Sequence, residues 1–141
     1  MGTITSTAPA RPTPRAVRRP APAGRSVLLL AAGGMIIGSF LPWVQTGFGM
    51  YRGVAGAGLW TFYVGVLALA GALVPVRWVA LGHALVAGAV AVSLPAWQFL
   101  RLFRRVGFTG WSPGTGLWVV FVAGIAALVS AWQTWRRPVA A

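Results

Sequence analysis

The chain has 141 residues, a formal net charge of +12 and no aspartate or glutamate, and 57% of its residues are hydrophobic. Soluble domains usually carry roughly a quarter charged residues, so a chain with only 9% is predicted to be embedded in a membrane. The missing carboxylates and cysteines exclude most acid–base chemistry, thiol chemistry and protein metal sites.

Residues 1–25 form a basic, proline-rich segment that is predicted to be a disordered cytoplasmic tail. Five prolines interrupt any regular helix, and almost no side chain here could contribute to a core. Its arginines are expected to fix the orientation of the chain and to bind anionic lipid headgroups. Nucleic-acid binding is not expected, because the tail is tethered to a membrane and contains no aromatic residue.

Four apolar segments follow, each about as long as a helix needs to cross about 30 Å of hydrocarbon. Each is apolar on all sides, as a lipid-embedded helix is. The predicted fold is therefore an all-α membrane protein with four transmembrane helices, arranged as two repeated helical hairpins in residues 26–137. The spans are about 26–44, 59–76, 78–100 and 117–135, and residues 138–141 form a short C-terminal tail. A tight turn joins the second and third spans, and the other two connections are predicted to be glycine-rich loops.

Tryptophan supports these boundaries independently. Seven of the eight tryptophans fall near the ends of spans, and Trp111 lies in a loop. An indole ring prefers the depth of the lipid headgroups, so this placement is typical of an aromatic belt at each membrane surface.

The distribution of arginine predicts the orientation. With the N-terminus inside, eight arginines lie on the inner side, and the outer side holds Arg52, Arg101, Arg104 and Arg105. Because positive residues concentrate on the cytoplasmic side of membrane helices, we expect a multi-pass protein of the plasma membrane with both termini in the cytoplasm.

Two parts of the sequence resemble each other. The segment 56–60, GAGLW, matches 114–118, GTGLW, and Leu-Pro pairs at 41–42 and 94–95 precede them. The unit would be a helix, a Leu-Pro pair, a glycine-rich loop and a second helix. Two copies of an even-spanning unit are related by an axis along the membrane normal. Chance similarity between helices rich in glycine and alanine is the alternative.

The basic proline-rich tail, Leu41-Pro42-Trp43 and the two Gly-Leu-Trp helix openings resemble small, uncharacterised four-span membrane proteins of GC-rich actinobacteria. The resemblance covers most of the chain. It implies a bacterial membrane location and a four-span architecture, and it implies no activity and no site residues.

Small residues recur at four-residue spacing within three of the spans. They are Gly34 and Gly38 in the first, Ala84 and Gly88 in the third, and Ala123 and Ala127 in the fourth. Such faces let helix backbones approach closely, which is how helices associate in lipid. We interpret them as contacts within one chain, with a seam between chains as the alternative.

Arg101, Arg104 and Arg105 share one helical face through their spacing. An arginine at the bilayer centre is costly, so all three are expected past the membrane edge, on an extension of the third helix. They would anchor the chain to lipid phosphate or, alternatively, dock an anion or an acidic partner.

His83 is the only histidine and lies little more than a turn inside the third span. A proton relay or haem site would need a second histidine, a carboxylate or a thiolate, so we interpret His83 as a hydrogen-bonded interfacial residue. We expect a non-enzymatic protein without cofactor or metal.

The expected role is an accessory or scaffolding subunit of a larger membrane assembly. A small oligomeric transporter or channel, with anions as candidate solutes, is the alternative. The expected partners are anionic lipid headgroups and either a protein with an acidic surface or further copies of the chain.

Overall fold

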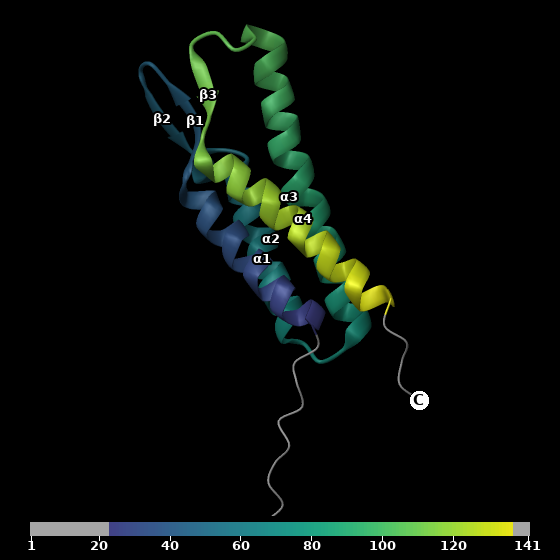
Figure 1. Cartoon of the computed structure of the whole chain (residues 1–141). Helices are drawn as coiled ribbons and strands as arrows, with labels where there is room; N and C mark the ends of the chain where they lie inside the picture. The colour runs from purple at the N-terminus through teal and green to yellow at the C-terminus, as the bar shows by residue number, and fades with distance from the viewer. Residues whose placement is uncertain (1–22, 137–141) are drawn as a thin grey trace, which may run out of the picture.

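The computed structural model describes residues 23–136 and places them in four helices and a small sheet (Figure 1). The helices are α1 (Ala23–Phe40), α2 (Gly58–Leu73), α3 (Arg77–Val106) and α4 (Thr115–Arg136). They run alternately up and down, and α1 and α3 each pack against both α2 and α4. The prediction of a helical protein is confirmed. α3 and α4 are long and apolar enough to cross a membrane, whereas α1 and α2 are shorter apolar helices.

The first helix differs from its predicted span at both ends. It begins at Ala23 and so takes in the last three residues of the predicted tail. It ends at Phe40, because Pro42 lacks an amide hydrogen and restricts Leu41 before it to extended conformations. The rest of the predicted tail lies outside the described residues, as does the C-terminal segment 137–141.

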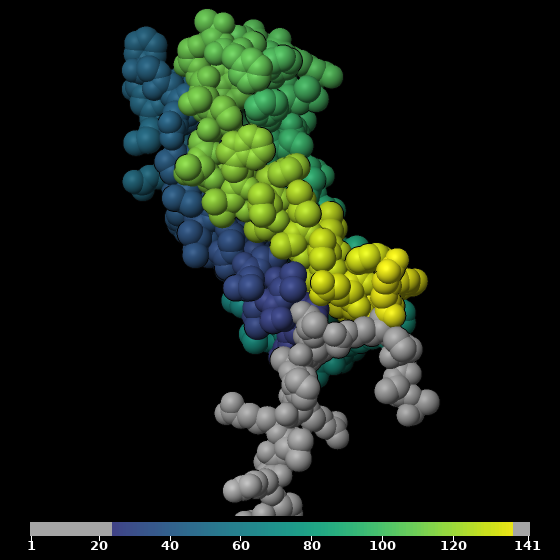
Figure 2. All heavy atoms as spheres, viewed as in Figure 1, coloured from purple at the N-terminus to yellow at the C-terminus, as the bar shows by residue number. Residues whose placement is uncertain are grey.

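The two glycine-rich connections, predicted to be loops, contain a three-stranded antiparallel sheet. β1 (Pro42–Thr46) lies between β2 (Gly49–Arg52) and β3 (Trp111–Pro113), and a 3-10 turn, Gly53–Ala55, follows β2. The register places Thr46 opposite Gly49 and Val44 opposite Pro113. In Figure 2 the β1–β2 hairpin stands out beside the end of α3 as a ridge of its own. The prediction that these two connections are loops was therefore wrong for the segments that pair as strands.

α3 is longer than the third predicted span. Its 30 residues extend about 45 Å, against about 33 Å for the 22 residues of α4. The extra turns project past the bundle beside the sheet (Figure 1). The helix continues through Pro95 and stops at Gly107, whose φ of +60° favours glycine.

The two copies of the predicted repeat agree in structure at their Gly-Leu-Trp segments but not at their Leu-Pro pairs. The GAGLW segment leads into α2 and the GTGLW segment leads into α4, and each follows a strand or its 3-10 continuation. The Leu-Pro pairs differ, because Pro42 begins β1 whereas Pro95 lies inside α3.

Small side chains fill the bundle, and large apolar ones cover its outside. Within residues 23–136, ten of the eighteen buried hydrophobic residues are alanine. By contrast, Leu30, Ile37 and Val122 are each more than 60% exposed. Helices of a soluble bundle bury their large apolar side chains, whereas this bundle exposes them and buries small ones.

Candidate functional site

The glycine pair predicted in the first span faces α4. A Cβ added at Gly34 would lie 3.0 Å from the Cβ of Ala123, and one added at Gly38 would lie 2.8 Å from Cγ2 of Val120. Both distances are shorter than ordinary van der Waals contact. A side chain at either position would push α1 and α4 apart, so glycine is what permits their close approach. Gly34 and Gly38 therefore pack helices of the same chain together.

The small residues predicted on α3 and α4 also lie inside the bundle. Ala84, Ala123 and Ala127 are buried. Gly88 packs against α4, where an added Cβ would lie 2.8 Å from the Leu128 side chain. Five of the six predicted packing residues are thus buried, and the half-buried Gly34 contacts α4 of the same chain. Large apolar side chains remain on the outer surface.

Three hydroxyl groups are buried between the helices. The hydroxyl oxygens of Ser39 on α1 and Thr61 on α2 lie 2.7 Å apart, and each also lies 2.7 Å from a carbonyl oxygen of its own helix. One hydroxyl donates to the other, and the accepting hydroxyl donates to its carbonyl. Ser130 on α4 donates to the Gly24 carbonyl at the start of α1 over 2.6 Å. These bonds join α1 to both of its neighbours in an interior that is otherwise mostly alanine.

The three arginines predicted as a docking site lie on the part of α3 that projects past the bundle. Arg101, Arg104 and Arg105, the arginine cluster, are all exposed. The Arg101 guanidinium lies 5.2 Å from the ring of Trp97, which is a cation–π contact. Because the chain contains no aspartate or glutamate, the cluster can find no carboxylate side chain within it.

Arginines at the opposite end of the bundle cap helix ends. Nη2 of Arg25 on α1 donates to the Leu73 carbonyl that ends α2, over 3.1 Å. Nη2 of Arg77 on α3 donates to the Trp135 carbonyl near the end of α4, over 2.9 Å. The last carbonyls of a helix lack intrahelical partners and carry partial negative charge, so these contacts stabilise both helix ends.

His83 lies half-buried on α3, with Nδ1 2.7 Å from the carbonyl oxygen of Val79 one turn earlier. Its Cβ packs so closely on Gly71 of α2 that any side chain at Gly71 would collide with it. Within the described part of the chain, no group of three His, Cys, Asp or Glu residues could hold a metal ion. The geometry is that of a histidine bonded to its own helix at a helix contact.

An aromatic cluster, which was not predicted, ties the end of α3 to β3. It consists of Phe99, Phe103, Phe108 and Trp111, whose contacting rings have centroids 5.0 to 6.4 Å apart. Nε1 of Trp111 also donates to the Gly107 carbonyl over 2.7 Å. These contacts hold the projecting turns of α3, and with them the arginine cluster, against the sheet.

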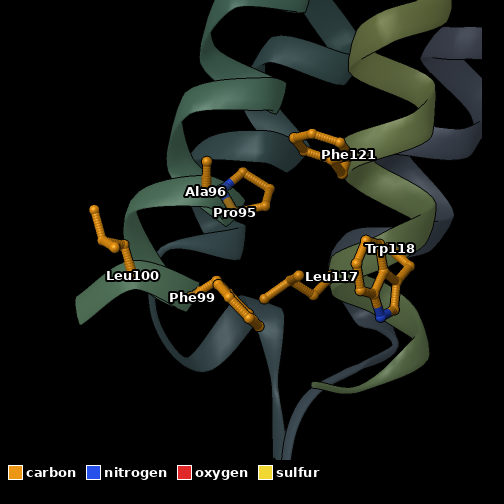
Figure 3. A pocket seen from close by; sticks show the side chains of 7 residues that line it. All are labelled: Pro95, Ala96, Phe99, Leu100, Leu117, Trp118 and Phe121. Carbon is orange, nitrogen blue, oxygen red and sulfur yellow. The ribbon is translucent and has the colours of Figure 1, made fainter. Parts of the chain in front are cut away.

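A cavity of about 320 Å³ opens between α3 and α4 next to this aromatic cluster, with which it shares Phe99 (Figure 3). We call it the α3–α4 groove. Its apolar lining comes from Pro95, Ala96, Phe99 and Leu100 of α3 and from Leu117, Trp118 and Phe121 of α4. In Figure 3, Phe99 and Leu117 point towards each other and narrow the groove on the side of the sheet.

A second cavity, of about 330 Å³, lies between the β1–β2 hairpin and α3. Its lining mixes apolar residues with polar ones, among them Thr46, Arg52 and Gln98. The walls of both cavities come from separate elements of the fold, and no motif in the sequence indicates that these elements meet.

Comparison of the chain with protein-family models, with curated proteins and with solved structures finds no match. Function is therefore inferred from the chemistry and geometry of the chain itself. Three features bear on it: the small-residue interior, the arginine cluster and the α3–α4 groove.

Proposed function

We propose that the chain is a multi-pass membrane protein in which all four helices, as two helical hairpins, cross the bilayer. The reversed packing of the bundle carries this proposal, because alanine and glycine fill the interior and large apolar side chains cover the outside. In water, so much exposed apolar surface would favour aggregation, whereas acyl chains solvate it in lipid. Close contacts through small residues are the way helices associate in that environment.

The exposed tryptophans support this placement. Trp78 and Trp97 on α3 are separated by 19 residues, or about 29 Å, and Trp118 and Trp135 on α4 by 17 residues, or about 26 Å. All four rings are more than half exposed. Two levels of indole at this separation match the two interfaces of a bilayer.

The shorter helices, α1 and α2, can span the same bilayer if its hydrocarbon core thins locally around them. The 18 residues of α1 and the 16 residues of α2 extend about 27 Å and about 24 Å. A bilayer accommodates a mismatch of a few Å by local thinning, at a cost of fractions of a kcal/mol per Å.

We place the end of the bundle that holds Arg25, Arg77 and Arg136 in the cytoplasm. With the five arginines outside the described residues, this side carries eight cations against four at the sheet end. The bias of positive charge towards the cytoplasm favours this orientation, with both termini inside. The sheet and the arginine cluster then face the outer side.

Within the membrane, the role that we propose is that of a non-enzymatic accessory or scaffolding subunit. The supporting observation is that the arginine cluster is exposed on turns of α3 that aromatic contacts join to β3, and that the chain has no carboxylate side chain to neutralise it. An acidic partner surface would supply the counter-charges, because a guanidinium binds a carboxylate through two parallel hydrogen bonds.

Purification of the full chain in mild detergent tests this role. We expect a complex of fixed stoichiometry with a second protein, identified by mass spectrometry, that dissociates at high salt. The double substitution Arg101→Gln and Arg105→Gln should release the partner, and Arg136→Gln, which removes a charge at the opposite end, should retain it. If the chain elutes alone as one defined homo-oligomer and conducts ions in liposomes, the subunit role is wrong and the channel alternative replaces it.

A further inference from the structure

The α3–α4 groove continues directly towards the arginine cluster. Ala96 and Leu100 line the groove, and Arg104 follows four residues later on the same stripe of α3. A step of four residues is about 6 Å along a helix axis. Arg104 therefore stands about one turn beyond Leu100, at the edge of the apolar wall that lies farthest from Pro95.

The surroundings place the groove at the depth where a lipid changes from hydrocarbon to headgroup. Trp97 and Trp118 mark the sheet-side level of exposed indole, and Trp118 is itself part of the groove wall. In Figure 3 the nitrogen of Trp118 lies at the end of its ring nearer the start of α4. An indole N–H in this position can donate to the polar part of an amphiphile whose tail lies in the groove.

We propose that the α3–α4 groove binds one anionic phospholipid, with an acyl chain between α3 and α4 and its phosphate at Arg104. This inference rests on the proposed placement of the helices in a bilayer. The apolar lining matches hydrocarbon, and a guanidinium binds phosphate through charge-assisted hydrogen bonds. A cation one turn beyond an apolar cavity fits an amphiphile better than it fits a uniformly apolar helix of another protein.

Lipid titration of the detergent-purified full chain, followed by native mass spectrometry, tests the phosphate contact. We expect one phosphatidylglycerol per chain, bound about fivefold more tightly than phosphatidylcholine, since one arginine near a membrane surface contributes about this factor. Arg104→Gln should remove the preference. Arg52→Gln, an equal loss of charge at an exposed position on β2, should keep it.

Substitutions that fill the groove test the acyl contact. Ala96→Phe places a ring in the cavity, and Ala89→Phe places the same ring on an exposed position of α3 about two turns away. We expect the first variant to lose the bound lipid and the second to retain it. If Ala96→Phe fails to fold, as judged by circular dichroism, Arg104→Gln still decides, because it changes only an exposed side chain.

Three results would overturn the proposal. They are equal binding of the two lipids, lipid binding that neither Arg104→Gln nor Ala96→Phe reduces, and displacement of the lipid by inorganic phosphate, which would indicate a site for a free anion. Extraction of membranes with alkaline carbonate separates this inference from the proposed function. A chain that stays in the pellet without lipid preference refutes only the groove site, whereas a chain that is released refutes the membrane placement as well.

Discussion

Ser39 and Thr61 bring their hydroxyl oxygens within 2.7 Å of each other at the contact between α1 and α2, and both residues are fully buried. The two helices are otherwise held by small residues, such as Gly65, where an added Cβ would lie 2.9 Å from Ile36 of α1. Van der Waals contacts between such residues resist sliding weakly, whereas a hydrogen bond has one preferred geometry. The hydroxyl pair thus specifies how α1 and α2 align.

Removing either hydroxyl should destabilise the bundle. We expect Thr61→Val, which keeps the shape of the side chain, to lower the free energy of unfolding by about 0.6 kcal/mol, the average for hydrogen bonds between helices in lipid, and by at most about 1.7 kcal/mol. Ser39→Ala should act similarly, and the double variant should cost less than the sum. Denaturant unfolding in micelles measures this, with Ser93→Ala, exposed on α3, as the control. If the losses of stability from the two single substitutions simply add in the double variant, the two hydroxyls do not bond to each other.

Two glycines of α1 should respond to alanine in opposite directions. At Gly38 an added Cβ would lie 2.8 Å from Cγ2 and 3.2 Å from the backbone nitrogen of Val120, so α1 and α4 would have to separate. We expect Gly38→Ala to cost about 1–3 kcal/mol, as overpacking of a core does. An added Cβ at Gly33 would come within 4 Å of no atom outside the backbone of its own helix, so Gly33→Ala should gain up to about 1 kcal/mol of helix propensity. Thermal unfolding in micelles compares the two, and equal signs would contradict the close contact of α1 with α4.

Trp43 should be the most sensitive residue of the sheet. It is 3% exposed, its Nε1 donates to the Gly38 carbonyl over 3.1 Å, and Gly116 packs on its ring. We expect Trp43→Ala to cost about 3–5 kcal/mol, the usual range for losing a buried aromatic side chain. Trp43→Ala should accelerate amide hydrogen exchange more in β1 than in α3. Trp60→Ala, at a position 65% exposed, is the matched control and should leave that exchange unchanged.

Reporter fusions should locate the two ends of the bundle on opposite sides of the membrane. A reporter that is active only in the cytoplasm should work when fused after Ala141. The same reporter should be inactive when inserted between Gly47 and Phe48, at the exposed turn of the β1–β2 hairpin. A C-terminal reporter that is active only outside the cytoplasm would refute the orientation that we derive from the arginine bias.

The helices were predictable because local signals define them. Apolar runs gave their approximate lengths, and Pro42 and Gly107 mark ends for reasons of backbone geometry. The strand β3 was missed because it pairs with β1, about 65 residues earlier, and no local pattern reports such pairing. The β1–β2 hairpin is local, and its short turn at residues 47–48 was interpreted only as part of a glycine-rich loop. The same limit applies to the α3–α4 groove, where Ala96 and Trp118 become neighbours only through folding.

Composition and residue order alone predict a membrane-embedded chain, through its apolar runs, its arginine clusters and its lack of carboxylates. They also determine which small residues can form close helix contacts, because spacing sets the faces of a helix. The folded arrangement shows that Gly34 and Gly38 pack on α4 of the same chain, and that Arg104 stands one turn beyond Leu100 of an apolar groove. The spacing of small residues shows which face of a helix can make close contacts. Which element packs against that face depends on how all four helices and the sheet are arranged together.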